Sequence, residues 1–218
     1  MHWLIPPNIL LYFVGALVSL FSIVDPLLAA PVFVSLTGHC TRQERISLAR
    51  RASFNVFGIL TAFFVAGTLI LGFFGISIVA LRLAGGLMIT SSAFAMLNKK
   101  ERLLPEEEQE AEGKEDIAFS PLAMPLLSGP GAIAVLIGLT TDAHHWMHFV
   151  SIFLVIILVS TACYWTLVAS DWVIPKLGQT LIRDFTRIMG FILLCVGVQY
   201  MVNGLSGVAV DIAKQIGH

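Results

Sequence analysis

Charged side chains are scarce in this sequence, and those present are clustered. Only 12% of the 218 residues are charged and 57% are hydrophobic, against roughly 25% and 45–50% in soluble domains. From residue 52 to 97 the only formally charged side chain is Arg82, and residues 149–170 contain none. A soluble protein of this length needs more surface charge. The scarcity excludes an ordinary soluble domain and indicates an integral membrane protein.

The sequence also lacks the patterns of common catalytic and metal sites. It has no HExxH motif, no GxSxG motif and no histidine within an apolar run, so a membrane-embedded enzyme has no candidate nucleophile or metal set. Its three cysteines have no metal-binding spacing. His144, His145 and His148 share an exterior loop without a cysteine, which favours a solvated cluster over a metal site. We expect no enzyme activity, no cofactor, no metal and no nucleic-acid partner.

Long apolar runs without polar alternation predict an all-α membrane protein. About 20 apolar residues are needed for each helical crossing of the hydrocarbon core, and a β-barrel requires alternation. We predict six transmembrane helices, of which the first is too long for a plain span and must be tilted, broken or extended. They cover about residues 8–36, 52–73, 79–97, 117–139, 149–170 and 188–207.

Basic residues fall on one side of the predicted bundle. Eleven of the thirteen Lys and Arg residues lie between spans one and two, three and four, or five and six. Cytoplasmic loops carry the excess of Lys and Arg, so we predict that both termini are periplasmic. The acidic run at 106–116 does not change this, because acidic residues count little in the rule. It is most simply a solvated linker.

The two halves of the sequence contain similar segments in the same order. Residues 26–31 read PLLAAP and residues 125–130 read PLLSGP, 99 positions later. Four further residues recur 105 positions later, namely Arg82, Gly85, Met96 and Asn98 as Arg187, Gly190, Met201 and Asn203. Each copy has three crossings, so the second must enter the bilayer from the opposite face. We predict two inverted three-helix repeats, 1–98 and 117–218, joined by a charged cytoplasmic linker at 99–116.

The paired prolines predict that the first and fourth helices are broken near the bilayer centre. A proline removes a backbone donor and crowds the preceding turn, so each copy should contain a short unwound stretch. Asp25-Pro26 resembles an N-cap followed by proline at the first helical position, and Ser128 or Gly129 can cap a helix that starts at Pro130. Free N–H groups at a helix start attract a carboxylate, and the carbonyls before the break suit an ammonium group or a cation.

A zwitterionic amino acid needs both kinds of partner, which makes the two breaks a candidate substrate site. Its predicted residues are Asp25, Pro26, Pro31, Pro125, Ser128, Gly129, Pro130, Gly131, Asn55 and Gln199. Asp25 is the only acidic residue within a predicted span, so it is also the candidate for proton or cation coupling. Alternatively, Asp25 only caps a helix near one interface and the prolines only bend it. Paired breaks in inverted halves favour the binding site.

These motifs resemble the MarC family of bacterial inner-membrane proteins. The resemblance lies in Phe21–Thr37 (FSIVDPLLAAPVFVSLT), Leu81–Gly86 (LRLAGG) and Ser120–Ile133 (SPLAMPLLSGPGAI), and it covers nearly the whole chain. It implies a multi-pass protein of the inner membrane that moves small neutral amino acids. The family motif usually has a glycine and a polar residue where Leu28 and Ala29 stand here, so the first break is expected to be less polar in this chain.

The expected function is a secondary transporter that exports or exchanges small neutral amino acids by alternating access. The sequence has no ATP-binding motif, so ion or substrate gradients would have to drive it. The expected partners are a neutral amino acid and membrane lipid, and homo-oligomerisation is left open. The alternative is a non-transporting scaffold or regulatory protein of the same family. Replacing Asp25 or Ser128 would then change stability, and there would be no flux to lose.

Overall fold

The computed structural model describes residues 9–38, 40–97, 123 and 127–216, and these residues are almost entirely helical. Their six α-helices are α1 (Ile9–Val24), α2 (Pro26–Leu36), α3 (Arg42–Phe73), α4 (Ile78–Leu97), α6 (Pro130–Thr141) and α7 (Trp146–Ile216). No strand occurs in this part of the chain. The prediction of an all-α protein is confirmed here, whereas the charged linker at 99–116 lies outside the described residues.

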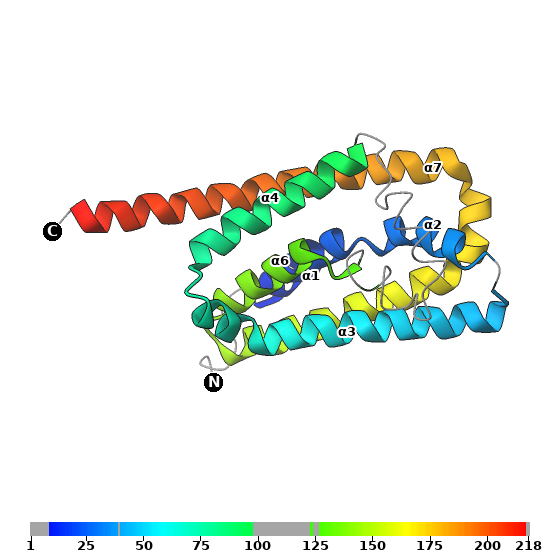
Figure 1. Cartoon of the computed structure of the whole chain (residues 1–218), viewed down its shortest axis with the longest axis horizontal. Coiled ribbons are helices and arrows are strands. Elements are labelled where there is room, and N and C mark those ends of the chain that lie inside the picture. Colours follow the sequence, from blue (N-terminus) through cyan, green and yellow to red (C-terminus); the bar gives the residue numbers. More distant parts are fainter. Residues whose placement is uncertain (1–8, 39, 98–122, 124–126, 217–218) are drawn as a thin grey trace.

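Three helices occupy the middle of the bundle. In Figure 1, α3 and the first part of α7 form one outer layer, and α4 and the second part of α7 form the other. α1, α2 and α6 lie between these two layers. α1 begins and α7 ends at the left of this view, whereas α3 begins at the right. Successive long segments therefore run in alternating directions, as in a bundle that crosses a layer repeatedly.

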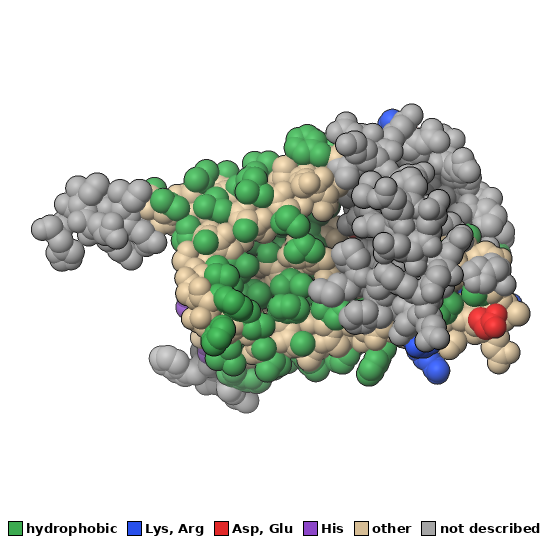
Figure 2. Space-filling model, viewed as in Figure 1, with side chains coloured by type: hydrophobic (Ala, Val, Ile, Leu, Met, Phe, Trp, Pro, Cys, Tyr) green, Lys and Arg blue, Asp and Glu red, His purple; other side chains and the backbone are tan. Residues whose placement is uncertain are grey.

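The outer surface of the bundle is apolar. Three segments are long and apolar enough to cross a membrane: α3, Trp146–Ser170 and Gly190–Ala209. Large hydrophobic side chains such as Leu69 and Phe73 are 73% and 85% exposed. Figure 2 shows hydrophobic side chains over the middle of the described surface and charged ones gathered toward one end. Exposed apolar surface of this extent fits contact with lipid.

α3 begins earlier than the predicted second span. The predicted span starts near residue 52, but the helix starts at Arg42, directly after Thr41, the N-cap residue of a capping box. The backbone N–H of Thr41 donates to the Glu44 carboxylate at 2.7 Å, and the Glu44 backbone N–H donates to the Thr41 hydroxyl at 3.4 Å. The helix has 32 residues and is about 48 Å long. Its arginine-bearing first turns therefore extend beyond a hydrocarbon core of about 30 Å.

The predicted connection between the fifth and sixth spans is helical, which corrects our expectation. Residues 146–216 form one continuous helical stretch, and its ribbon doubles back on itself (Figure 1). Arg187 therefore lies within α7 and not at a helix end. Pro175 and Gly178 fall between the two apolar segments, and such residues bend a helix without ending it when the flanking turns are held by packing.

α4 and the second part of α7 pack with their backbones in contact. A Cβ atom on Gly86 would lie 2.8 Å from the carbonyl oxygen of Gly197, and one on Gly197 would lie 2.9 Å from the backbone nitrogen of Thr90. Contacts of the same antiparallel series join Gly204 to Leu83 and Gly207 to Val79. Small residues at such positions let membrane helices approach closely.

Two tyrosine hydroxyls hold α6 in the centre of the bundle. Tyr12 of α1 donates to the carbonyl oxygen of Leu139 at 2.9 Å, and Tyr200 of α7 donates to that of Val135 at 3.3 Å. The two acceptors lie one helical turn apart. α6 is therefore fixed from both sides by elements far from it in the sequence.

Candidate functional site

The first break consists of a single residue, Asp25, between α1 and α2. Its φ of 40° is the only positive value among the described non-glycine residues. Pro26 disfavours helical backbone in the residue before it, which explains why the helix breaks here. Aspartate enters the left-handed region more readily than most residues. The break at Asp25-Pro26 is the one that the sequence predicted.

The backbone remains hydrogen-bonded across Asp25. Its N–H donates to the Phe21 carbonyl at 2.9 Å, and the Ala29 N–H donates to the Asp25 carbonyl at 3.4 Å. Pro31 lies inside α2, so the expectation of an unwound stretch between the two prolines is wrong for the first copy. A proline inside a helix removes only one intrahelical donor, here the one opposite the Leu27 carbonyl, and the neighbouring turns continue.

The second break lies at the start of α6. Gly129 is the N-cap residue, with φ −64° and ψ 171°, and Pro130 occupies the first turn. The Ser128 N–H donates to the Ala123 carbonyl at 2.8 Å, five residues back, which is the spacing of a π-type turn. Extended backbone at Gly129 thus ends this turn and starts a new helix, as predicted for Ser128 or Gly129 before Pro130.

The two breaks occupy different positions of the repeated segment. The first falls directly before Pro26, the first proline of its copy, and the second falls directly before Pro130, the second proline of its copy. Pro31, which corresponds to Pro130, is inside a helix. Pro125, which corresponds to Pro26, lies outside the described residues. The break before Pro130 therefore has no counterpart before Pro31.

Polar side chains at both breaks are buried in an apolar interior. Asp25 is 4% exposed and Ser128 is fully buried. Val24 and Leu127, which flank the two breaks, belong to one hydrophobic cluster. The Ser128 hydroxyl has no hydrogen-bond partner among the described residues. A carboxyl group and an unpaired hydroxyl are costly in such surroundings, which is typical of a functional site in a membrane protein.

Backbone groups at the breaks add donors and acceptors. Gly129 makes no side-chain cap, so the N–H groups of Gly131 and Ala132 in the first turn of α6 have no intrahelical partner. The Ser22 carbonyl stands four residues before Pro26, which has no N–H to donate. A helix start with free donors and partial positive charge favours a carboxylate, and the Ser22 carbonyl beside Asp25 favours an ammonium group.

A cavity of about 590 Å³ lies at the other end of α2. It is lined by Phe33, Val34, Cys40, Arg42, Arg45, Ile46, Leu167, Val168 and Trp172. The cavity therefore lies at the arginine-bearing end of the bundle, and its lining includes neither Asp25 nor Ser128.

The two amides predicted for the site lie on the long helices α3 and α7. Asn55 is half-buried on α3, and Gln199 is exposed on α7. The Gln199 amide donates to the side-chain oxygen of Asn203 at 2.9 Å, on the same helix face. The structure does not bring Gln199 to the breaks. The two tyrosine hydroxyls that donate to α6 are polar groups of the interior that sequence reasoning missed, because no local pattern pairs Tyr12 with Leu139.

Polar contacts cluster at the end of α6 farthest from the breaks. Arg82 forms an ion pair with Asp142, the C-cap residue of α6. A ring nitrogen of His144 lies 2.7 Å from the Asp142 carbonyl oxygen, and the His148 ring lies 4.3 Å from that of Tyr12. Among the described residues, no group of three or more potential ligands could hold a metal ion. These contacts join α1, α4, α6 and α7 at one end of the bundle.

The fold and the site define a helical integral membrane protein whose interior contains two helix breaks, one beside a buried acid and one beside a buried hydroxyl. The chain belongs to the MarC family of integral membrane proteins, whose family model matches residues 10–209. It is 36% identical to membrane protein YvbG of Bacillus subtilis over 200 residues, covering 90% of this chain and 95% of the relative. It is also 36% identical to inner membrane protein MarC of Citrobacter koseri over 202 residues, covering 87% and 91%. No solved structure matches this chain.

Proposed function

We propose that this protein is a secondary transporter that moves small neutral amino acids across the inner membrane by alternating access. The observation that carries the proposal is the pair of buried breaks, one beside Asp25 and one beside Ser128. A membrane helix gives up regular backbone only where a protein interior or a water-filled path covers it. Transporters use such breaks to bind substrates at mid-membrane.

The chemistry of the breaks suits a zwitterion. The carboxylate binds the free N–H groups of Gly131 and Ala132 and the Ser128 hydroxyl, and the ammonium group binds Asp25 and the Ser22 carbonyl. Apolar residues such as Val24 and Leu127 close around these groups, so a short side chain fits and a charged one does not. Asp25 is also the group that exchanges a proton or cation during the cycle.

Six crossings arranged as two inverted repeats explain how the site reaches both sides. α4 and the second part of α7 are the third helices of the two copies, and they pack antiparallel through Gly86 and Gly197. A two-fold axis in the membrane plane requires that equivalent helices run in opposite directions. The alternating helix directions in Figure 1 and the apolar outer surface also support this topology.

Helix lengths support a position for both breaks inside the hydrocarbon core. α1 has 16 residues and α6 has 12, which correspond to about 24 Å and 18 Å. Both helices run between a break and the same end of the bundle (Figure 1). In a hydrocarbon core of about 30 Å, the break before α6 then lies near the centre, and the break at Asp25 lies inside the core but nearer the opposite face. The opposite end, which contains Arg42 to Arg51, faces the cytoplasm, and both termini face the periplasm.

The test is transport by the purified protein in proteoliposomes. A panel of labelled amino acids is offered in uptake and counterflow experiments, with and without a pH gradient. We expect flux of small neutral amino acids, such as alanine and serine, and none of charged or aromatic ones. Absence of flux for every neutral amino acid, in a preparation shown to be folded and inserted, would refute the transporter and favour the scaffold alternative.

The role of Asp25 is tested separately. Asp25→Asn keeps the size of the side chain and removes its charge, so we expect a folded protein that has lost gradient-driven uptake. Asp184→Asn is the matched control, because Asp184 is exposed on α7 and far in sequence from both breaks. Full uptake by Asp25→Asn would leave the transporter in place and exclude Asp25 as the coupling residue.

A further inference from the structure

A second site lies on the outside of the bundle, between α3 and the first part of α7. A groove of about 410 Å³ is formed there by Arg50, Ser53 and Phe57 of α3 and by Ile157, Ser160 and Tyr164 of α7. The residues follow one face of each helix at spacings of three or four. The groove is separate from the breaks, and a role for it does not depend on transport.

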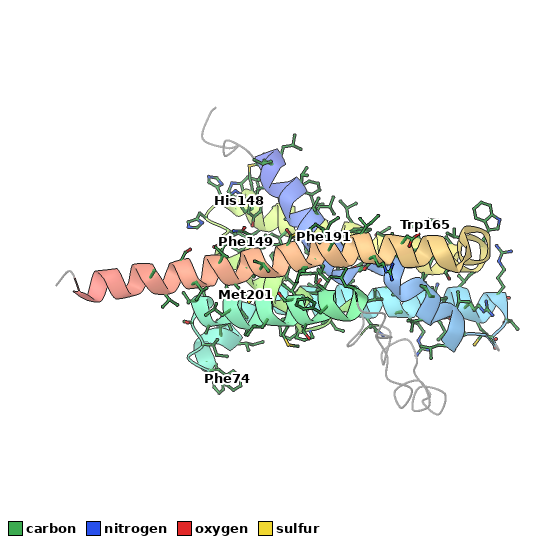
Figure 3. All side chains as sticks on the ribbon, turned by 90° about the horizontal axis from the view of Figure 1, so that it is seen from above. Phe74, His148, Phe149, Trp165, Phe191 and Met201 are labelled. Atoms are coloured by element: carbon green, nitrogen blue, oxygen red, sulfur yellow. The ribbon has the colours of Figure 1, made fainter. Side chains whose placement is uncertain are left out.

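The polarity of the groove changes with depth. α3 and the first part of α7 run in opposite directions (Figure 1), so Arg50 and Tyr164 stand together at one end. Ser53 and Ser160 lie one turn further in, and Phe57 and Ile157 lie another turn deeper. Figure 3 places Trp165, the neighbour of Tyr164, toward the end where α3 begins. Aromatic residues at such positions mark the interface between the membrane and water.

Among the described residues, no acidic side chain neutralises the charge at the mouth of the groove. Arg50 is exposed, and no carboxylate of the described residues forms an ion pair with it. The groove itself contains no acidic side chain. The nearby Arg45 is engaged differently, because it donates to the carbonyls of Thr37 and Gly38 at the end of α2. Arg50 therefore offers, within the described part of the chain, a cation without a carboxylate partner at head-group level.

Two hydroxyl groups in the floor of the groove lack partners. Ser53 and Ser160 are each 6% exposed, and neither hydroxyl has a hydrogen-bond partner among the described residues. By contrast, the neighbouring Thr161 hydroxyl donates to the carbonyl of Ile157, one helical turn earlier, at 2.7 Å. A buried hydroxyl without an acceptor is unfavourable. Rotation about one side-chain bond can turn a serine hydroxyl toward the groove.

We propose that this groove binds one anionic phospholipid. The phosphate is bound by the Arg50 guanidinium and the Tyr164 hydroxyl, and the ester carbonyls accept hydrogen bonds from Ser53 and Ser160. The acyl chain lies over Phe57. A groove that has a cation and no carboxylate favours a head group with net negative charge over a zwitterionic one, whose ammonium group would find no partner. Anionic lipids also attract basic segments at the cytoplasmic surface.

The experiment uses the full-length protein purified in detergent and stripped of lipid. Native mass spectrometry and thermal melting measure the binding of phosphatidylglycerol, phosphatidylethanolamine and inorganic phosphate. We expect one phosphatidylglycerol to bind and to raise Tm, and the other two to do neither. Equal binding of the two lipids would overturn the proposal, and so would a rise in Tm with inorganic phosphate alone.

Variants locate the site. Arg50→Gln should weaken phosphatidylglycerol binding by about tenfold or more, as expected for a lost charged hydrogen bond. Arg51→Gln removes the same charge one residue further on, outside the groove, and should change binding less than twofold. Equal effects of the two variants would show general attraction to basic residues and refute the site. If Arg50→Gln does not fold, Tyr164→Phe tests the same phosphate contact, and undiminished binding in that variant would refute it.

Discussion

The contact between Gly86 and Gly197 yields a quantitative prediction about stability. In Gly86→Ala, the new methyl group would lie 2.8 Å from the Gly197 carbonyl oxygen, whereas ordinary contacts begin at 3.4 Å. α4 and α7 must separate by about 0.6 Å, the difference between these distances. Overpacking of this kind costs about 1–3 kcal/mol. The measured loss of stability will be smaller than this cost, because alanine is favoured over glycine inside a helix by about 1 kcal/mol.

A matched control variant corrects for this gain in helix propensity. A Cβ atom on Gly58, in the middle of α3, would have nothing within 4 Å, so Gly58→Ala has the same gain in helix propensity without the clash. Gly86→Ala should therefore be less stable than Gly58→Ala by about 1–3 kcal/mol. Thermal unfolding in detergent measures this difference as roughly 2–4 °C in Tm for each kcal/mol.

The double variant makes the test more specific. Once Gly86→Ala has separated the two helices, Gly197→Ala at the same contact should cost less than it does alone, because neighbouring substitutions are not additive. Equal Tm values for Gly86→Ala and Gly58→Ala would refute the backbone contact between α4 and α7. Full additivity of Gly86→Ala and Gly197→Ala would refute a contact that the two glycines share.

Two further predictions concern the interior. Tyr12→Phe and Tyr200→Phe each remove one hydrogen bond to α6 and should lower the unfolding free energy by about 1 kcal/mol, more for Tyr12, whose bond is shorter at 2.9 Å against 3.3 Å. Unchanged Tm in both variants would contradict the role of these hydroxyls. Ser128→Ala should leave Tm unchanged or raised while it reduces amino-acid uptake, and undiminished uptake would exclude Ser128 from the substrate site.

Local chemistry made the breaks predictable. The dipeptides Asp25-Pro26 and Gly129-Pro130 cause the breaks locally, because proline disfavours helical backbone in the residue before it whatever the surrounding fold. The effect of proline on helices gave a wrong prediction at Pro31, which lies inside α2. The free-energy cost of a proline inside a helix depends on the packing of the surrounding turns. The membrane-spanning class was equally accessible, because it follows from composition. The start of α3 was readable from the spacing of Thr41 and Glu44.

Contacts between distant segments could not be predicted in the same way. The Tyr12 hydroxyl meets Leu139, 127 positions away, and only the packing of α1 against α6 brings them together. The exposure of Gln199 depends on the rotation of α7 about its axis, which an almost uniformly apolar sequence does not specify. The helical turn between the two parts of α7 likewise depends on tertiary packing, because Pro175 and Gly178 are compatible with either a bend or an end.

The unequal placement of the two breaks has an energetic consequence. In a transporter with identical halves, the states open to either side would be mirror images of equal energy. In the transport cycle that we propose, one hinge is a single left-handed aspartate and the other is the extended Gly129 behind a π-type turn. Hinges of such different construction resist bending by different amounts. The empty transporter should therefore favour the state that is open to one side of the membrane. Substrate binding must then offset the difference in free energy before the state open to the other side is populated.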